Sequence, residues 1–205
     1  MHRRKQPFLF VGGHPCLDFI NTQMMVKGQL TDLLERFEDL GSWLLQANLV
    51  TKAQWKSVYT QLDHREQEGL LEEAKTLRAT LRVAADRIVA RKTIPDSTFD
   101  AINRVLSRRP GYPQLVRTRE GGLERRFHFV AVPKESLLPL LAEAASDLLC
   151  LPDLSLVKKC GNPSCVLYFY DSTKNHTRNW CSMQLCGNRM KVAAYFRRKR
   201  RTPQR

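Results

Sequence analysis

The N-terminal part of this 205-residue sequence lacks a long hydrophobic run. In MHRRKQPFLFVGG the apolar stretch comprises only residues 8–11. A signal peptide needs a core of about 7 to 15 apolar residues, and a membrane-spanning helix needs about 20. We therefore expect a protein that is neither exported nor inserted in a membrane and that resides in the cytoplasm. In that reducing compartment its six cysteines are expected to be thiols or metal ligands rather than disulfides.

Acidic residues are almost absent from the last quarter of the chain. Between residues 158 and 205, twelve Lys and Arg stand against one acid, Asp171, so this part carries +11 of the formal charge of +14. The asymmetry predicts a nearly neutral domain over residues 1–152 and a basic module over residues 153–205. A basic module of this kind is typical of proteins that bind a polyanion. A solvated basic face is the alternative.

The body also lacks the common catalytic motifs. Its only tight polar group is His14, Cys16 and Asp18, with no H-E-x-x-H, phosphate-binding loop or nucleophile elbow nearby. A base and nucleophile formed by His14 and Cys16 would require a depressed thiol pKa. We therefore expect a protein that is not an enzyme.

Hydrophobic periodicity predicts a mainly helical body. Apolar residues recur at helical spacing near residues 14–24, 31–45, 51–62, 65–92, 96–107 and 135–151, with Thr31 or Asp32 as a cap of the second segment. Residues 8–11 predict a short strand, and residues 113–117 and 123–132 predict a hairpin that turns at Gly121 and Gly122. The predicted fold class is α+β: a mainly helical N-terminal domain with a short β-hairpin or small sheet, followed by a small C-terminal module that ends in a basic helix.

Four of the cysteines form two close pairs in a C-x4-C-x15-C-x4-C pattern: Cys160, Cys165, Cys181 and Cys186. Two pairs about one hairpin apart suit one tetrahedral zinc ion, because each short loop presents two sulfurs to the metal. Four thiolates saturate zinc, so the predicted site is structural and treble-clef-like or zinc-ribbon-like. His176 lies between the two pairs and is the alternative ligand. If no metal binds, the cysteines are unrelated thiols or redox pairs. A further hypothesis is that oxidation of the thiolates releases the zinc.

The residues after Ser182 predict a basic C-terminal helix. At 100° per residue, Arg189, Val192 and Phe196 share a face with Cys186 and are expected to point inward, with Arg189 bracing the module by pairing with Asp171 or by capping carbonyls. The residues predicted to contact nucleic acid are Lys191, Arg197, Arg198, Arg201, Tyr195 and Arg178. Binding to an anionic membrane is less favoured, because the apolar face is narrow.

The stretch from Cys160 to Lys199, with the sequence Cys186-Gly187-Asn188-Arg189, resembles the CGNR zinc finger. CLDFINT at residues 16–22 and the helix that contains LRATLR resemble the ABATE domain of bacterial stress-induced transcription regulators. This sequence has Phe19 and Ile20 where that family's LDLVNT motif has Leu and Val. The resemblance implies a DNA-binding regulator, zinc held by the four cysteines, and an N-terminal domain that senses a small ligand.

Four polar residues of the body are candidates for binding that ligand. Asp18 and Asn21 lie three residues apart, and Arg78 and Arg82 lie one turn apart on the longest predicted helix. The arginines would meet Asp18 or an anionic ligand. A helix cap or an internal salt bridge is the structural alternative.

The leading functional hypothesis is a zinc-dependent transcriptional regulator that docks its basic helix on double-stranded DNA. The alternative partner is RNA, as for ribosome- or tRNA-associated zinc proteins. In that case Trp180, Tyr195 and the aromatic run at residues 168–170 would stack on unpaired bases.

Overall fold

The computed structural model describes residues 6–109, 111–118, 121–129 and 137–201. Its helical part comprises α1 (Pro15–Ile20), α2 (Phe37–Gln46), α3 (Lys52–Gln61), α4 (His64–Val89), α5 (Asp96–Leu106) and α6 (Leu137–Leu149). The prediction of a mainly helical α+β fold is confirmed.

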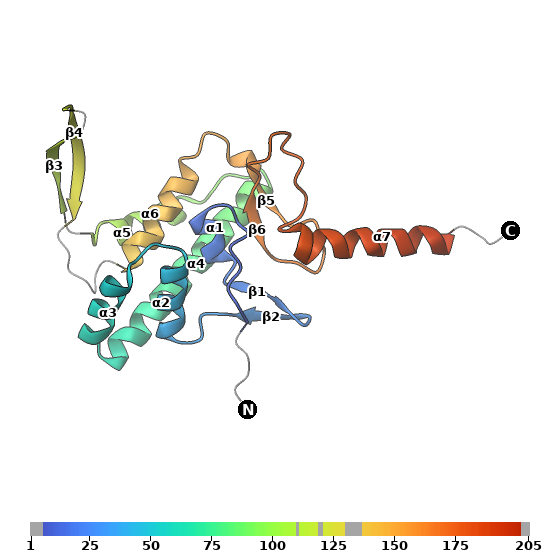
Figure 1. Cartoon of the computed structure of the whole chain (residues 1–205), viewed down its shortest axis with the longest axis horizontal. Coiled ribbons are helices and arrows are strands. Elements are labelled where there is room, and N and C mark those ends of the chain that lie inside the picture. The colour runs from blue at the N-terminus through green and yellow to red at the C-terminus, as the bar shows by residue number, and fades with distance from the viewer. Residues whose placement is uncertain (1–5, 110, 119–120, 130–136, 202–205) are drawn as a thin grey trace.

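Helix α4 is the central element of the body (Figure 1). Asp63 caps its N-terminus through a reciprocal bond with Glu66, and a stripe of buried residues that includes Leu77 and Leu81 follows its length. Helices α1, α2, α5 and α6 all contact α4, so its apolar stripe organises the largest core cluster. Neither α4 nor another helix in the described ranges combines the length and apolarity needed to cross a membrane.

A two-stranded antiparallel hairpin, β1 (Gln23–Val26) and β2 (Gln29–Asp32), follows α1. Lys27 and Gly28 form its turn with φ values of 49° and 83°, which is the backbone of a type I′ turn. The expectation that residues 14–24 form one helix is therefore wrong beyond Ile20. The expected cap at Thr31 or Asp32 is also wrong: α2 begins after Arg36, whose backbone N–H donates to the Asp39 carboxylate.

A second hairpin, β3 (Gly111–Arg117) with β4 (Leu123–Phe129), stands apart from the helical body (Figure 1). This hairpin confirms the prediction, although expected strand residues 130–132 lie outside the described residues. Residues 8–11 do not form the expected strand. They run beside the C-terminal module, where the Tyr170 N–H donates to the Gly12 carbonyl, and this single backbone bond is too little for a ladder.

The C-terminal module begins with the turn η2 (Leu154–Leu156) and the short antiparallel pair β5 (Val157–Lys159) and β6 (Tyr168–Tyr170). The π-helical turn η3 (Met183–Gly187) leads into α7 (Asn188–Arg201), which projects away from the body (Figure 1). Leu167 and Phe169 share a small core with Met24 of β1 and with Leu33, which follows β2. The module thus packs on the body through its strands and leaves α7 extended.

Candidate zinc centre and nucleic-acid interface

The four predicted zinc ligands come together in the structure. Cys160 follows β5, Cys165 ends the next loop, Cys181 follows the loop after β6, and Cys186 lies in η3. Their sulfur atoms all lie within 4.8 Å of one another, and the Sγ atoms of Cys165 and Cys181 are 3.9 Å apart. Zn–S bonds of about 2.3 Å in a tetrahedron place sulfurs about 3.8 Å apart. The cluster therefore fits one structural zinc ion.

Nitrogen donors around the cluster compensate thiolate charge. The Cys181 N–H donates to Cys160 Sγ at 3.4 Å, and the Asn162 side-chain amide donates to Cys186 Sγ at 3.3 Å. Hydrogen bonds from the Cys165 and Cys181 thiols lower the pKa of Cys160, and the matching bond to Cys160 raises the pKa of Cys165. Four sulfurs this close hold their full negative charge only around a cation. Sequence reasoning missed Asn162, whose position inside the first C-x4-C loop was its only signal.

A buried carboxylate organises the loop between the two cysteine pairs. Asp171 is fully buried, and its carboxylate accepts hydrogen bonds from Lys158 Nζ at 2.6 Å, from the Thr173 hydroxyl and from the Arg178 N–H. Burial alone would raise the pKa of Asp171, but these donors hold it well below its ordinary value. His176 points one ring nitrogen at the Asp171 carbonyl and is not part of the sulfur cluster.

The Arg178 side chain lies against the module itself. Its guanidinium donates to the carbonyls of Val11 and Trp180 and lies 4.2 Å from the centre of the Phe169 ring. These contacts join the N-terminal segment to the loop before Cys181. Arg178, which the sequence predicted as a nucleic-acid contact, thus uses its guanidinium for contacts inside the protein.

Helix α7 presents the other predicted contact residues. Lys191, Arg197 and Tyr195 are exposed, while the side chains of Arg198 and Arg201 lie outside the described residues. The expectation that Val192 and Phe196 face inward is wrong, because each is 55% exposed. Beyond its first turn α7 extends away from the body (Figure 1), so the described part of the chain offers it no surface to pack against.

Arg189 does not brace the module through Asp171, because Lys158 and the loop backbone occupy that carboxylate. It is exposed and lines a cavity beside the cysteines. The aromatic run that the RNA hypothesis invokes is largely inside: Tyr168 and Phe169 are fully buried. Trp180 is half-buried, which leaves Tyr195 as the most accessible of the proposed stacking residues.

Two family models match consecutive parts of the chain. Residues 13–152 match ABATE, described as "Putative stress-induced transcription regulator", and residues 157–199 match the CGNR zinc finger. The chain belongs to the ABATE family. No curated protein matches the sequence. The four cysteines are the ligands that a zinc finger requires, and the ABATE part covers the helical body together with both of its hairpins.

Within the ABATE part, Asp18 and Asn21 fix α1 to its surroundings. The buried Asp18 carboxylate accepts from the Gly12 N–H at 2.7 Å, and burial raises the pKa of Asp18 to about 6. A Cβ atom at Gly12 would lie 2.9 Å from that carboxylate, so the approach requires glycine. The Asn21 amide donates to the Tyr168 carbonyl and accepts from the Tyr168 N–H, which pairs α1 with β6 of the finger.

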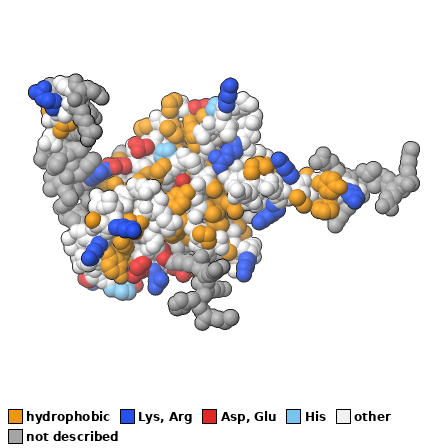
Figure 2. Space-filling view, viewed as in Figure 1, with side chains coloured by type: hydrophobic (Ala, Val, Ile, Leu, Met, Phe, Trp, Pro, Cys, Tyr) orange, Lys and Arg blue, Asp and Glu red, His pale blue; other side chains and the backbone are white. Residues whose placement is uncertain are grey.

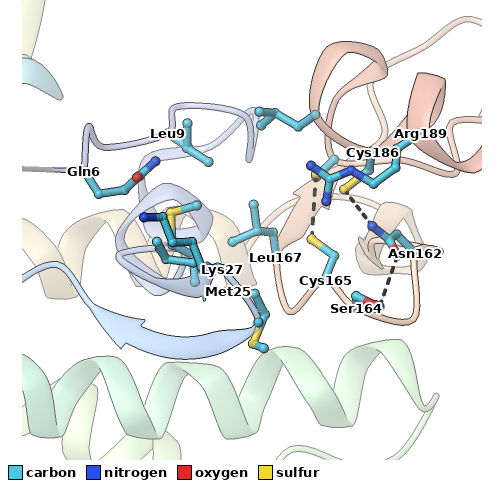
Figure 3. Close-up of a pocket in the computed structure, with 15 residues that line it drawn as sticks. Gln6, Leu9, Met25, Lys27, Asn162, Ser164, Cys165, Leu167, Cys186 and Arg189 are labelled. Carbon is cyan, nitrogen blue, oxygen red and sulfur yellow. Dashed lines mark hydrogen bonds between the residues drawn. The ribbon is translucent and has the colours of Figure 1, made fainter.

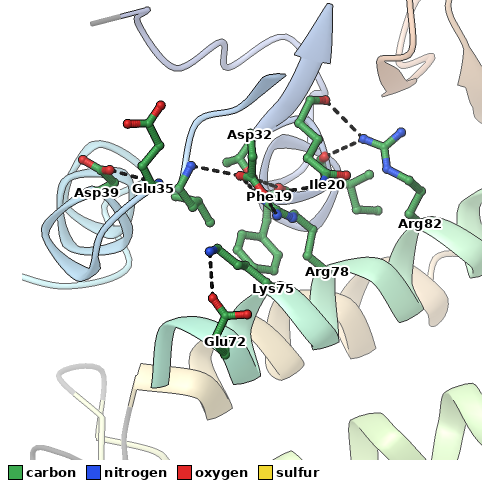
Figure 4. Close-up of polar contacts among 12 residues, drawn as sticks. Phe19, Ile20, Asp32, Glu35, Asp39, Glu72, Lys75, Arg78 and Arg82 are labelled. Carbon is green, nitrogen blue, oxygen red and sulfur yellow. Dashed lines mark hydrogen bonds and ion pairs between the residues drawn. The ribbon is translucent and has the colours of Figure 1, made fainter. Parts of the chain in front are cut away.

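Arg78 and Arg82 attach α4 to the β1–β2 hairpin and to the end of α1 (Figure 4). Arg78, only 2% exposed, forms a bidentate pair with Asp32 and donates to the Thr22 hydroxyl. Arg82 donates to the carbonyls of Ile20 and Gln23. Neither arginine pairs with Asp18 among the described contacts. All four candidate ligand-binding residues thus make internal bonds, as the structural alternative predicts.

The enzyme alternative required a low thiol pKa at Cys16. Cys16 is buried in the main core, and burial raises its pKa to about 12. The His14 ring caps α1 by accepting from the Cys16 N–H. Both side chains therefore have structural positions: the Cys16 sulfur is buried in the core, and the His14 imidazole caps the start of α1.

Proposed function

We propose that the protein is a zinc-dependent, DNA-binding transcriptional regulator in which α7 contacts DNA. The observation that carries the proposal is the projection of α7 beyond the body with exposed cations and no acidic residue in Asn188–Arg201 (Figures 1 and 2). The exposed cations of α7 whose side chains the structure describes are Arg189, Lys191, Arg197 and Lys199. A helix of this width enters the major groove, and its cations neutralise phosphates.

The zinc centre gives this helix a fixed start. Ser182 caps η3, Cys186 lies within it, and Asn188 begins α7 immediately afterwards. Zinc binding by Cys186 would therefore define the direction in which α7 leaves the finger. In this proposal the ABATE part senses a small ligand in the cytoplasm and changes how α7 is presented.

RNA is the second candidate partner because of one feature of α7. Tyr195 is 57% exposed, and its ring packs edge-on against Phe196 at 5.6 Å between centroids. An exposed aromatic among cations suits stacking on an unpaired base. A titration with both nucleic acids distinguishes DNA from RNA as the partner.

The test is a titration of the zinc-loaded protein with duplex DNA and with structured RNA at two salt concentrations. The test variant is Lys191→Ala/Arg197→Ala, and the control is Lys52→Ala/Lys56→Ala, which removes the same charge from exposed positions on α3. We expect the α7 variant to weaken DNA binding and to reduce the slope of log affinity against log salt by about 2. The α3 variant should retain the wild-type slope.

Equal slopes in the wild type and the α7 variant would remove α7 from the interface. Tighter binding of RNA than of DNA would assign the finger to RNA. Binding of neither nucleic acid would overturn the proposed function.

A further inference from the structure

A cavity of about 460 Å³ lies between the N-terminal segment, the β1–β2 hairpin and the zinc finger (Figure 3). We call it the hairpin–finger cavity. Its apolar lining consists of Leu9, Met24, Met25, Val26, Leu167 and Leu185. Sites for small molecules typically measure about 300 to 1,000 Å³ and are mostly apolar with a few polar groups. The cavity has the size and lining of such a site.

The charged groups that line the cavity balance one another. Cys165, Cys181 and Cys186 contribute to its wall, and four thiolates around one Zn²⁺ carry two net negative charges. Lys27 and Arg189 supply two positive charges, and no Asp or Glu among the described residues lines the cavity. Neither cation forms an ion pair with a described residue. A charged ligand would upset this balance, whereas an uncharged one would preserve it.

The two cations also define the polar group that a ligand should carry. Lys and Arg side chains donate hydrogen bonds and accept none. A bound molecule therefore needs an acceptor, such as a carbonyl oxygen, at the end that meets Lys27 or Arg189. The rest of the molecule would lie against methionine and leucine side chains, which adapt readily to different apolar shapes.

We propose that the hairpin–finger cavity binds a small, uncharged, predominantly apolar molecule with a carbonyl-type acceptor. Such a ligand would touch β1 and the Lys27 turn on one side and Leu185 and Arg189 on the other. Arg78 and Arg82 tie the hairpin region to α4, while Arg189 lies in the first turn of α7. Occupancy would thus connect the ABATE part to α7. This regulatory consequence, but not the binding itself, rests on the proposed function.

The test uses octan-2-one as the probe and protein labelled with ¹³C at the methionine methyl groups. Met24 and Met25 line the cavity, while Met183 and Met190 do not. We expect saturable shifts of the Met24 and Met25 methyl signals and much smaller changes at Met183 and Met190. Octanoate and octylammonium, which have the same chain length, should bind at least about tenfold more weakly because each adds an uncompensated charge.

Met25→Trp fills the cavity and should abolish the shift of the remaining cavity signal, that of Met24. Val83→Trp is the matched control, because Val83 is an exposed apolar residue on α4 that does not line the cavity. Zinc content of one ion per chain shows that either variant retains the finger. Absence of saturable shifts in the wild type, or shifts that survive in a zinc-loaded Met25→Trp protein, would overturn the proposal.

Lys27→Gln provides a second test that does not depend on tolerance of a large side chain. Lys27 is exposed at the turn, and its removal leaves the cavity with net negative charge. We expect octylammonium to gain affinity relative to octan-2-one, whereas Lys52→Gln on α3 should leave the ratio unchanged. Unchanged selectivity in Lys27→Gln would contradict the charge balance. Both measurements omit nucleic acid, so failure of DNA binding would not affect them.

Discussion

Asp171, the one acid among twelve cations between residues 158 and 205, holds together several parts of the finger. Its carboxylate binds Lys158 of β5 and the Arg178 backbone, and Lys158 also donates to the His176 carbonyl at 2.7 Å. One buried group therefore joins a strand to the loop that leads to Cys181. The surrounding positive charge favours the ionised form, which supplies the acceptors that the loop needs.

Replacement of Asp171 by Asn should destabilise the finger by about 1.5 to 3 kcal/mol, because the buried side chain would lose its charge-assisted hydrogen bonds with Lys158 and the Arg178 N–H. Since the folded-state pKa of Asp171 lies below its unfolded value, its stabilising contribution is complete above about pH 4 and is lost as pH falls through the folded-state pKa. Urea unfolding at pH 7 measures the first effect, and a series from pH 7 down to pH 2 follows the onset of the second. Asp153→Asn is the control, because that exposed carboxylate bonds the nearby Ser155; a similar loss in both variants would contradict a special role for Asp171.

At the scale of elements, the β1–β2 hairpin depends on α4 for its position. Its strands are only four residues long, and an isolated hairpin of this size is marginal in water. Arg78 supplies a long-range attachment to Asp32 at the end of β2, as Figure 4 shows. Because Arg78 is buried and Asp32 is not fully exposed, the pair lies where losing one partner is costly.

Arg78→Ala should lower the free energy of unfolding by about 3 to 5 kcal/mol. Lys75→Ala is the matched control one turn earlier, where the Lys75 side chain is half-buried but its partner Glu72 is exposed, so the ion pair contributes about 1 kcal/mol or less. Urea denaturation of both variants gives the comparison. Equal, small losses would indicate that Arg78 is not a structural attachment and would restore it as a ligand-binding candidate.

Local sequence patterns predicted the elements, but not the attachments between them. The apolar stripe of α4 and the spacing of the cysteines are local signals, and both led to correct predictions. The bonds of Asn21 to Tyr168 and of Arg78 to Asp32 span 147 and 46 residues, and no periodicity encodes them. The inward face assigned to Val192 and Phe196 was wrong because amphipathic spacing does not reveal whether a neighbouring surface exists. Lys27-Gly28 was the readable turn signal for the missed hairpin.

At the scale of the whole molecule, two core clusters differ in their dependence on zinc. The larger cluster, which includes Trp43 and Leu77, contains none of the four zinc ligands. The smaller cluster combines Met24, Leu33 and Phe169 with three of those ligands, Cys160, Cys181 and Cys186. A metal-bound module with so small a core depends on the metal for its folding free energy.

Zinc removal by a chelator should therefore unfold the finger and loosen the β1–β2 hairpin while α4 and α6 remain folded. Amide hydrogen exchange should show lost protection in β5, β6 and β1 but retained protection along α4, and binding to DNA should disappear. Restoring zinc under reducing conditions should recover both the hydrogen-exchange protection of these strands and the binding to DNA. Loss of α4 protection together with the finger would show one cooperative unit, and the larger cluster would then be unable to hold the body without metal.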